Sequence, residues 1–571
     1  MNVEIPTREP RSFLQEEFKV EKWETIQPFL ENLLSRVINS ADELKKWFKD
    51  RSELDAVLSE DMAWRYIKMT CDTTDEKLKE SFNFFVSEIE PKIAPYSDEL
   101  NRKVLDCQFL DQTEEPGYDI LIRNMKMEVE IFREKNIAIK AELSQKSHEF
   151  GAISGAMSIE LDGQELTLQQ AAVKLQDTDR ELREKVYSMI STRRLQDREK
   201  LDGLFSELIK LRSQLAENAD FANYRDYMFA AMSRFDYTPQ DCFDFHQSVS
   251  DAVVPMLNEM ARERKDKLKV DQLRPWDKAV DTSGKAPLKP FSTSKELIDT
   301  TIECFSRLDP FLGQCLAIMN KMGHLDLESR KGKAPGGYNY PLMEIGVPFI
   351  FMNATSTLRD MVTILHEGGH AVHSFLMRDL ELSEFKSTPS EVAELASMSM
   401  ELLTMDHWDL FFKDEDDLRR AKQDHLEQII DTLPWVATID KFQHWIYENP
   451  THSLEERKAA WNRIFSQFSD SITDWNGLEP NRDFLWQKQL HLFEVPFYYI
   501  EYGMAQLGAV AVWKNFKEDR QKGLDGYMNA LKLGNLATIP EVYAAANIKF
   551  DFSSDYIKEL MEFVKAELKK L

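Results

Sequence analysis

The chain has 571 residues, which at ordinary domain sizes corresponds to about three or four structural units. Hydrophobic residues make up 43% of it and charged residues 30%, a composition typical of folded globular proteins that excludes disorder of the whole chain. The 72 Lys and Arg residues against 99 Asp and Glu residues give a formal net charge of −27. Because a general nucleic-acid binder needs a basic surface, no nucleic-acid partner is expected.

The cysteine usage and the N-terminus favour a reducing compartment. The odd number of cysteines and the absence of a C-x-x-C pair argue against a thiolate zinc cluster and against a thioredoxin-type motif. These cysteines are Cys71, Cys107, Cys242, Cys304 and Cys315. Residues 1–10 lack the apolar core of a secretory signal, and no apolar stretch is long enough to cross a membrane. We therefore expect a cytoplasmic protein without a membrane span.

The first third of the chain is dominated by helical patterns. The sequence T-D-R-E at Thr178–Glu181 reads as a capping box, and the apolar residues that follow recur at helical spacing. Asp162-Gly163 lies between short apolar stretches and predicts one β-hairpin within residues 157–168. Residues 270–293 contain three prolines and predict a loop.

The centre of the chain predicts a small β element. Residues 328–340 are rich in Gly, Pro and polar residues, and Gly336-Gly337 indicates a tight turn or a close backbone approach. The apolar segment 347–353 is short and β-rich and predicts a strand. Residues 358–571 again have mostly helical patterns, so we expect a mainly α protein with a small β element next to residues 366–370.

Residues 366–370 read His-Glu-Gly-Gly-His, the H-E-x-x-H motif of zinc peptidases. On a helix, His366 and His370 project from one face and can bind one metal ion, while Glu367 is turned toward its open side. There Glu367 can take a proton from water and later pass it to the leaving amine. Residues 358–378 read as the helix, with Thr357 as N-cap. The two glycines cost about 1 kcal/mol each relative to alanine, which indicates that a substrate or a neighbouring strand approaches the backbone closely.

A catalytic zinc ion needs a third protein ligand. The downstream histidine of the H-E-x-x-H-x-x-G-x-x-H pattern is missing, because residue 376 is leucine. The following helical segment 390–403 offers Glu391, Glu394 and Glu401. Glu394 and Glu401 share a helix face, so one could bind the metal while the other holds a histidine. Spacing alone does not decide whether Glu391 or Glu394 is the third metal ligand.

His373 lies seven residues after His366 on the same predicted face. We interpret it as a candidate substrate contact. The alternative is a histidine whose hydrogen bonds are satisfied within the helix packing.

The stretch HEGGHAVHSF, residues 366–375, resembles the signature of the M3 family of zinc peptidases, the thimet oligopeptidase and oligoendopeptidase F group. Residues 331–353 are similar to the family's glycine-tyrosine loop and following strand, and VAELAS, residues 392–397, to the segment that carries its third ligand. Residues 496–505, PFYYIEYGMA, are similar to its tyrosine-rich segment. The resemblance covers most of the chain from about residue 157 onward.

The resemblance implies a mainly helical, clam-like peptidase with a deep substrate channel, divided into an N-terminal helical domain, residues 1–195, and a catalytic domain, residues 196–571. It implies one Zn²⁺ per chain on His366, His370 and Glu394, and short peptides as substrates of an oligoendopeptidase. A metallocarboxypeptidase or dipeptidyl carboxypeptidase is the alternative, followed by a non-catalytic peptide-binding protein. A monomer or a homodimer is expected.

The tyrosine-rich segment supplies the remaining candidate site residues. Tyr498 and Tyr502 are four residues apart and share a helix face, and His491 lies shortly before them. Hydroxyl and imidazole groups can both donate hydrogen bonds to the oxyanion of a tetrahedral intermediate. In family terms Tyr498 and His491 carry this task and Tyr502 contacts substrate. The sequence departs from some family members at Ala505, where they have a further tyrosine.

Overall fold

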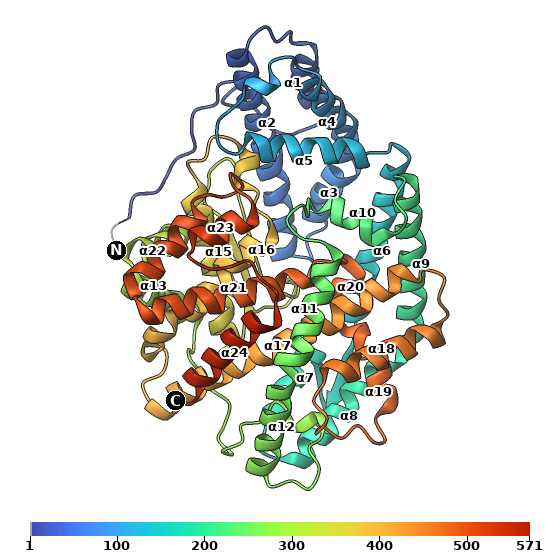
Figure 1. Cartoon of the computed structure of the whole chain (residues 1–571), viewed down its shortest axis with the longest axis vertical. Helices are drawn as coiled ribbons and strands as arrows, with labels where there is room; N and C mark the ends of the chain where they lie inside the picture. The colour runs from blue at the N-terminus through green and yellow to red at the C-terminus, as the bar shows by residue number, and fades with distance from the viewer. Residues whose placement is uncertain (1–2) are drawn as a thin grey trace.

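The computed structural model describes residues 3–571, apart from the side chain of His148. Met1 and Asn2, the start of the segment in which no secretory signal is expected, lie outside it. The described chain is mainly helical with two small sheets, as the sequence predicts (Figure 1). Within it, no helix combines the length and the apolar character that a membrane span requires.

Five helices from the first quarter of the chain lie together at the top of Figure 1. They are α1 (Trp23–Ser35), α2 (Ala41–Cys71), α3 (Glu76–Phe84), α4 (Glu90–Leu105) and α5 (Tyr118–Ile131). Their buried side chains, among them Trp47 and Tyr118, form a separate hydrophobic cluster that we call the N-terminal cluster. Leu382 and Phe385, which come from far along the chain, are part of it.

The predicted β-hairpin is confirmed. Strands β1 (Ser158–Leu161) and β2 (Gln164–Thr167) pair antiparallel, and Asp162 and Gly163 have φ angles of 53° and 80°, as a tight two-residue turn requires. The prediction of Thr178 as N-cap is wrong by one residue. Asp179 caps the helix, because its carboxylate accepts hydrogen bonds from the backbone N–H groups of Glu181 and Leu182.

The helices between the N-terminal group and the central sheet spread around Figure 1, with α6, α9 and α10 at the right, α7, α8 and α12 low in the view, α11 in the middle and α13 at the left. They are α6 (Lys135–Gly155), α7 (Leu168–Val173), α8 (Arg180–Gln196), α9 (Arg198–Asn218), α10 (Tyr224–Ala231), α11 (Pro239–Ala252), α12 (Val254–Leu268), α13 (Ser294–Leu308) and α14 (Pro310–Met322). The predicted loop at 270–293 is confirmed except for a single 3₁₀ turn at Pro275–Asp277.

The central sheet has three strands in the order β3-β5-β4. The predicted strand is β5 (Phe349–Ala354), which pairs parallel with β3 (Leu325–Glu328) and antiparallel with β4 (Tyr338–Tyr340). Residues 328–340, which are rich in Gly, Pro and polar residues, thus end in an edge strand, β4. Gly337 precedes this strand, and a Cβ atom there would lie 3.3 Å from the backbone oxygen of Phe351, so the expected close backbone approach is confirmed.

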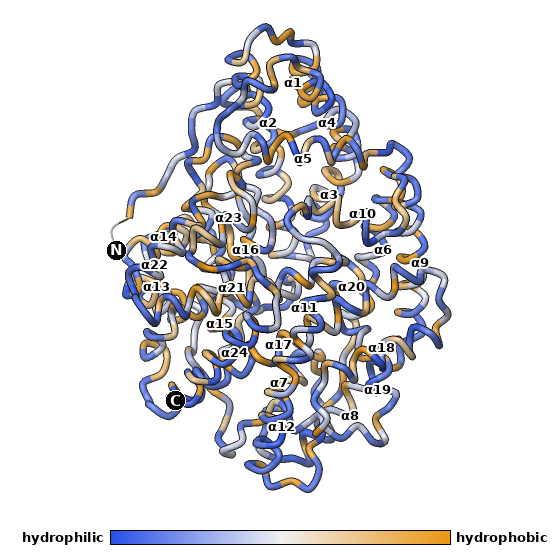
Figure 2. The backbone as a smooth tube through the Cα atoms, viewed as in Figure 1, coloured by the Kyte–Doolittle hydropathy of each residue, from blue (hydrophilic) through white to orange (hydrophobic). Residues whose placement is uncertain are grey.

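The remaining helices build the large core. They are α15 (Leu358–Met377), α16 (Ser390–Leu403), α17 (Glu415–Glu448), α18 (Leu454–Phe468), α19 (Glu479–Asp483), α20 (Leu490–Glu494), α21 (Tyr499–Glu518), α22 (Arg520–Leu531), α23 (Ile539–Ala545) and α24 (Ser554–Leu568). Helix α16 packs between α15 and α21. Figure 2 shows hydrophilic residues along the outer turns, such as those around α12, whereas hydrophobic residues gather on the inner helices.

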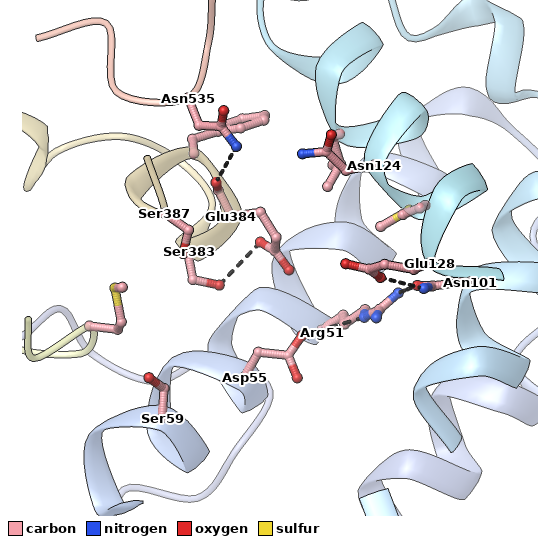
Figure 3. Close-up of a pocket in the computed structure, with 14 residues that line it drawn as sticks. Arg51, Asp55, Ser59, Asn101, Asn124, Glu128, Ser383, Glu384, Ser387 and Asn535 are labelled. Carbon is pink, nitrogen blue, oxygen red and sulfur yellow. Dashed lines mark hydrogen bonds and ion pairs between the residues drawn. The ribbon is translucent and has the colours of Figure 1, made fainter. Parts of the chain in front are cut away.

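The boundary at residues 195 and 196 stays a prediction. Most buried apolar residues of α1 to α5 belong to the N-terminal cluster, whereas Ile139 and Phe150 of α6 belong to the large core. Next to the N-terminal cluster, a cavity of about 360 Å³ lies between α2, α5 and the turn Ser383–Lys386 (Figure 3). Arg51, Glu128 and Glu384 line it, and none of the predicted site residues does.

Candidate metal centre and active site

Helix α15 holds the H-E-x-x-H motif, and local sequence signals fix where it begins. The Thr357 hydroxyl accepts from the backbone N–H of Asp360, and the Asp360 carboxylate accepts from the backbone N–H of Thr357. This reciprocal capping box satisfies two donors that a helix start leaves unpaired. The prediction of a helix from residue 358 with Thr357 as N-cap is confirmed.

The two glycines of the motif allow α15 to approach its neighbours closely. A Cβ atom at Gly369 would lie 2.6 Å from the Cα of Ser397 on α16, and one at Gly368 would lie 2.7 Å from the ring of Phe305. The expected close approach is therefore confirmed. The neighbours, however, are a helix and an aromatic ring, and the prediction of a substrate or a strand at this place is wrong. The close α15–α16 packing is what brings Glu394 toward the two histidines.

His366, His370 and Glu394 come together as a cluster that we call the open cluster. Their candidate ligand atoms all lie within 4.8 Å of one another. Glu394 Oε2 lies 3.2 Å from His366 Nε2 and 3.8 Å from His370 Nε2. Burial opposes ionisation of Glu394, yet His366, His370 and Tyr498 outweigh it and lower the pKa of the carboxyl to about 2. Two imidazoles and one carboxylate at these separations are a donor set that fits a catalytic zinc ion.

Glu401 supports the first histidine, as the shared helix face predicts. Its Oε1 lies 2.6 Å from His366 Nδ1, which leaves His366 Nε2 directed at Glu394. The other carboxylate oxygen of Glu401 lies 3.5 Å from His425 Nε2 on α17. Burial opposes protonation of His366, but Glu394 and Glu401 outweigh it and raise the pKa of the ring well above its ordinary value. His425 was not predicted as a site residue, because no local sequence pattern distinguishes it from other histidines.

Glu391, the residue that spacing left open, has other partners. It is buried and accepts a 2.6 Å hydrogen bond from the hydroxyl of Tyr237. Arg234 lies 3.9 Å from the same oxygen and pairs with Glu501 at 2.6 Å. Glu391 is thus part of a buried ionic group that ties α16 to α21, separate from the open cluster.

Glu367 is 7% exposed and lies next to the open cluster. Burial is the largest cause that raises the pKa of this carboxyl to about 7. Asn339 of β4 donates a 3.2 Å hydrogen bond to the backbone oxygen of Glu367. Strand β4, which the sequence did not predict, therefore lies beside the predicted general base, Glu367.

The predicted aromatic residues also gather at the open cluster. The hydroxyl of Tyr498 donates to Glu394 Oε1 at 3.0 Å, and the rings of Tyr498 and Tyr502 are 5.3 Å apart. The hydroxyl of Tyr502 lies 3.4 Å from His491 Nε2. Burial lowers the pKa of His491 to about 4, so the ring is neutral. Gln489 holds the other nitrogen of His491 at 2.7 Å.

His373 is not part of this group. It is 2% exposed, and burial lowers the pKa of its ring to about 3. Its Nε2 has no hydrogen-bond partner among the described residues, and the backbone hydrogen bond of the ring is to Leu531 on α22. The ring thus lies in the packing between α15 and α22. Its predicted role as a substrate contact stays a prediction that these contacts do not support.

Fold and open cluster together define a helical metallopeptidase-like protein, and comparison with known proteins gives its family. Residues 173–562 match Peptidase family M3, and residues 13–132 match the Peptidase M3 N-terminal domain. The chain therefore belongs to peptidase family M3.

Several relatives are named for a peptidase activity. An oligoendopeptidase F homolog from Lactococcus lactis subsp. lactis is 24% identical over 62% of this chain and 58% of its own length. Oligopeptidase PepF from Bacillus subtilis is 23% identical over 60% of this chain and 52% of its own length. The chain thus covers less than two thirds of these curated relatives.

Solved structures cover more of the chain. PZ peptidase A with an inhibitor has a TM-score of 0.90 and 27% identity over 98% of this chain and 99% of its own. Oligoendopeptidase-F from Enterococcus faecium has a TM-score of 0.64 and 16% identity over 96% and 97%, a likeness of fold alone. The expected mainly α fold is confirmed.

Proposed function

We propose that the protein is a zinc-dependent oligoendopeptidase that hydrolyses internal bonds of short peptides. The observation that carries the proposal is the open cluster with the buried Glu367 beside it. A purely binding or structural site has no need of that carboxylate. Membership of family M3 and relatives named oligoendopeptidase F support the same activity.

His366, His370 and Glu394 would hold the zinc ion. When bound, zinc supplies a Lewis acid that polarises the scissile carbonyl and makes a bound water more acidic. Glu401 keeps the His366 ring oriented through its hydrogen bond to Nδ1. That leaves the three ligand atoms facing a common centre and Glu367 free for proton transfer.

The chain's own residues would carry the proton and the developing charge. Glu367 takes the proton of the attacking water and returns it to the amine that leaves. Tyr498, whose hydroxyl now donates to the metal-ligand candidate Glu394, is placed to donate to the oxyanion instead. His491 is a second donor for the same charge, and Tyr502 lies beside it to contact the substrate.

The names of the relatives, oligoendopeptidase F, favour endopeptidase over exopeptidase action. A carboxypeptidase needs a cationic side chain to hold the free carboxylate of its substrate. The chain has 72 Lys and Arg residues, so the cleavage products, rather than the site residues, distinguish the two modes.

Cleavage of a blocked, internally quenched peptide of about ten residues tests the proposal, before and after chelation and zinc return, with products read by mass spectrometry. We expect internal cleavage that disappears with the chelator and recovers with zinc. Cleavage only of an unblocked peptide, with release of a C-terminal residue or dipeptide, would replace the proposal by the carboxypeptidase alternative. A protein that holds zinc and cleaves neither peptide would be a binding protein.

A further inference from the structure

A second group of metal-ligand side chains lies between α11 and α17, which pack against each other. Cys242 and His246 are four residues apart on α11, and Asp440 and His444 are four residues apart on α17. Each pair therefore projects from one face of its helix, by the same rule that pairs His366 with His370. We call these four residues the closed cluster.

Three members of the closed cluster have donor atoms close together. Ligand atoms of Cys242, Asp440 and His444 all lie within 4.8 Å of one another, and Asp440 Oδ2 lies 3.3 Å from His444 Nε2. In a tetrahedral zinc site with the usual bond lengths, donor atoms are roughly 3.3–3.7 Å apart. The fourth member, His246, places its Nε2 2.8 Å from the same oxygen of Asp440, as a hydrogen-bond partner of that carboxylate.

The two histidine pairs of the molecule can be compared directly. The rings of His246 and His444 are 5.9 Å apart and inclined at 80°. Those of His366 and His370 are 4.9 Å apart and inclined at 86°. The two pairs are similarly inclined, and the rings of the closed cluster are farther apart, which agrees with His246 contacting Asp440 rather than a shared metal position.

The closed cluster has polar groups that the protein alone leaves unsatisfied. Cys242 and Asp440 are 0% exposed, and His246 and His444 are 1% exposed. Both ring nitrogens of His444 and Nδ1 of His246 lack a hydrogen-bond partner within residues 3–571. In the same range, the ion-pair partners of the Asp440 carboxylate are these two histidines, with no Arg or Lys. Burying the Asp440 carboxylate without a permanent positive charge beside it costs free energy, and a bound cation would offset that cost.

We propose that the closed cluster binds a second zinc ion through Cys242, Asp440 and His444, with His246 holding the Asp440 carboxylate in place. One thiolate and one carboxylate balance the two positive charges, so the occupied site is neutral in its apolar surroundings. Zinc takes the place of the thiol proton of Cys242, which is released to solvent. Because this site uses one thiolate with a histidine and an aspartate, the absence of a C-x-x-C pair does not exclude it.

The surroundings assign the closed cluster a structural role. The rings of Phe243 and Phe497 lie 4.9 and 5.3 Å from that of His444, and Phe468 lies 6.4 Å from His246. The burial of all four members and this aromatic wall shut substrate out, so the ion would hold α11 and α17 together rather than act on a peptide.

The closed cluster also connects to the peptidase site. Gln443 donates to Asp440 Oδ1 at 3.0 Å and accepts from the backbone N–H of Phe497 at 2.8 Å. Phe497 has a φ angle of 68°, unusual for a bulky residue, and directly precedes Tyr498. A metal at the closed cluster would fix the orientation of Asp440 and, through Gln443, the backbone that presents Tyr498.

Metal content of the purified full-length protein tests the proposal. We expect two zinc ions per chain in the wild type, one in His370→Ala and one in Cys242→Ala. The matched control is Cys304→Ala, which removes another fully buried cysteine and should retain two. One zinc ion in the wild type and none in His370→Ala would overturn the proposal, even if Cys242→Ala fails to fold.

Cobalt substitution gives a readout that does not depend on activity. The open cluster has no sulfur ligand, so a thiolate-to-cobalt charge-transfer band in the near ultraviolet can come only from Cys242 among the proposed ligands. We expect the band in the wild type and in His370→Ala, and its loss in Cys242→Ser. Two bound cobalt ions without this band would overturn the ligand assignment, because Cys242 would then be outside the metal site.

Discussion

The open and closed clusters are built on the same helical spacing but lie in different surroundings. The side chains of His366 and His370 are 20% and 18% exposed, and the open cluster borders Glu367 and Tyr498, groups that can exchange protons. The closed cluster is sealed behind phenylalanine rings. The same i, i+4 spacing therefore brings candidate metal-ligand side chains together in both clusters. Whether the site is catalytic or structural is decided by what fills the fourth position and what stands next to it.

The largest effect is expected from Glu367→Gln, which removes the proton acceptor that distinguishes the open cluster. We expect kcat/KM on the quenched peptide to fall by about 10²–10⁴-fold, with zinc content unchanged. Glu415→Gln, an exposed position on α17, is the control and should leave kcat/KM as it is. Full activity of the Glu367 variant would overturn its assignment as the general base.

Tyr498→Phe tests whether the aromatic side of the open cluster takes part in the reaction. Loss of one donor to an oxyanion lowers kcat by about 10²–10³-fold, and KM should change little. Tyr499→Phe, the neighbouring tyrosine, should have a much smaller effect. Equal losses in the two variants would show that the segment contributes packing rather than a specific hydroxyl.

Glu401→Gln tests whether the hydrogen bond between Glu401 and His366 strengthens metal binding at the open cluster. Loss of the charged hydrogen bond to His366 Nδ1 is expected to weaken zinc binding by about 10–100-fold. Competition with a chromophoric zinc chelator measures this directly. An unchanged affinity would mean that the orientation of His366 is set by helix packing alone.

Gly369→Ala tests the close approach that assembles the open cluster. The new Cβ would lie 2.6 Å from a Cα atom and 2.8 Å from a carbonyl oxygen of α16, so the helices must separate. We expect unfolding by denaturant to show a loss of about 1–3 kcal/mol. Gly151→Ala on α6 is the control, since a Cβ there meets nothing within 4 Å, and it should stabilise the protein by about 0.5–1 kcal/mol. Equal stability of the two variants would contradict the packing argument.

What the sequence predicted correctly has local causes. Thr357 and Asp360 are three residues apart and cap α15, and Asp162-Gly163 forms its hairpin within ten residues. The spacing of His366 and His370 follows from one helical turn. The choice of Glu394 over Glu391 did not follow from spacing and came from the resemblance to family M3. In the structure, that choice depends on where Tyr237 and Arg234 hold Glu391.

The features that the sequence did not predict depend on contacts between segments that are far apart in the chain. Asn339 lies on a three-residue edge strand within a glycine- and proline-rich stretch, whose pairing with β5 no local pattern reveals. His425 comes near Glu401 because the fold brings α17 back to the end of α16 and the 3₁₀ turn that follows it. The closed cluster joins two helices almost 200 residues apart in the chain, and each pair alone is an unremarkable C-x-x-x-H or D-x-x-x-H.

The segment that links α15 to α16, the two helices of the open cluster, packs against the start of the chain. Leu382 and Phe385 lie in this segment and are buried in the N-terminal cluster, and Phe385 lines the cavity of Figure 3. A truncation that removes residues 1–131 would expose these two side chains and release the connection between the helices. The first five helices thus bury the connection between the two helices of the open cluster, and Ser52 of α2 holds it through hydrogen bonds with Ser383.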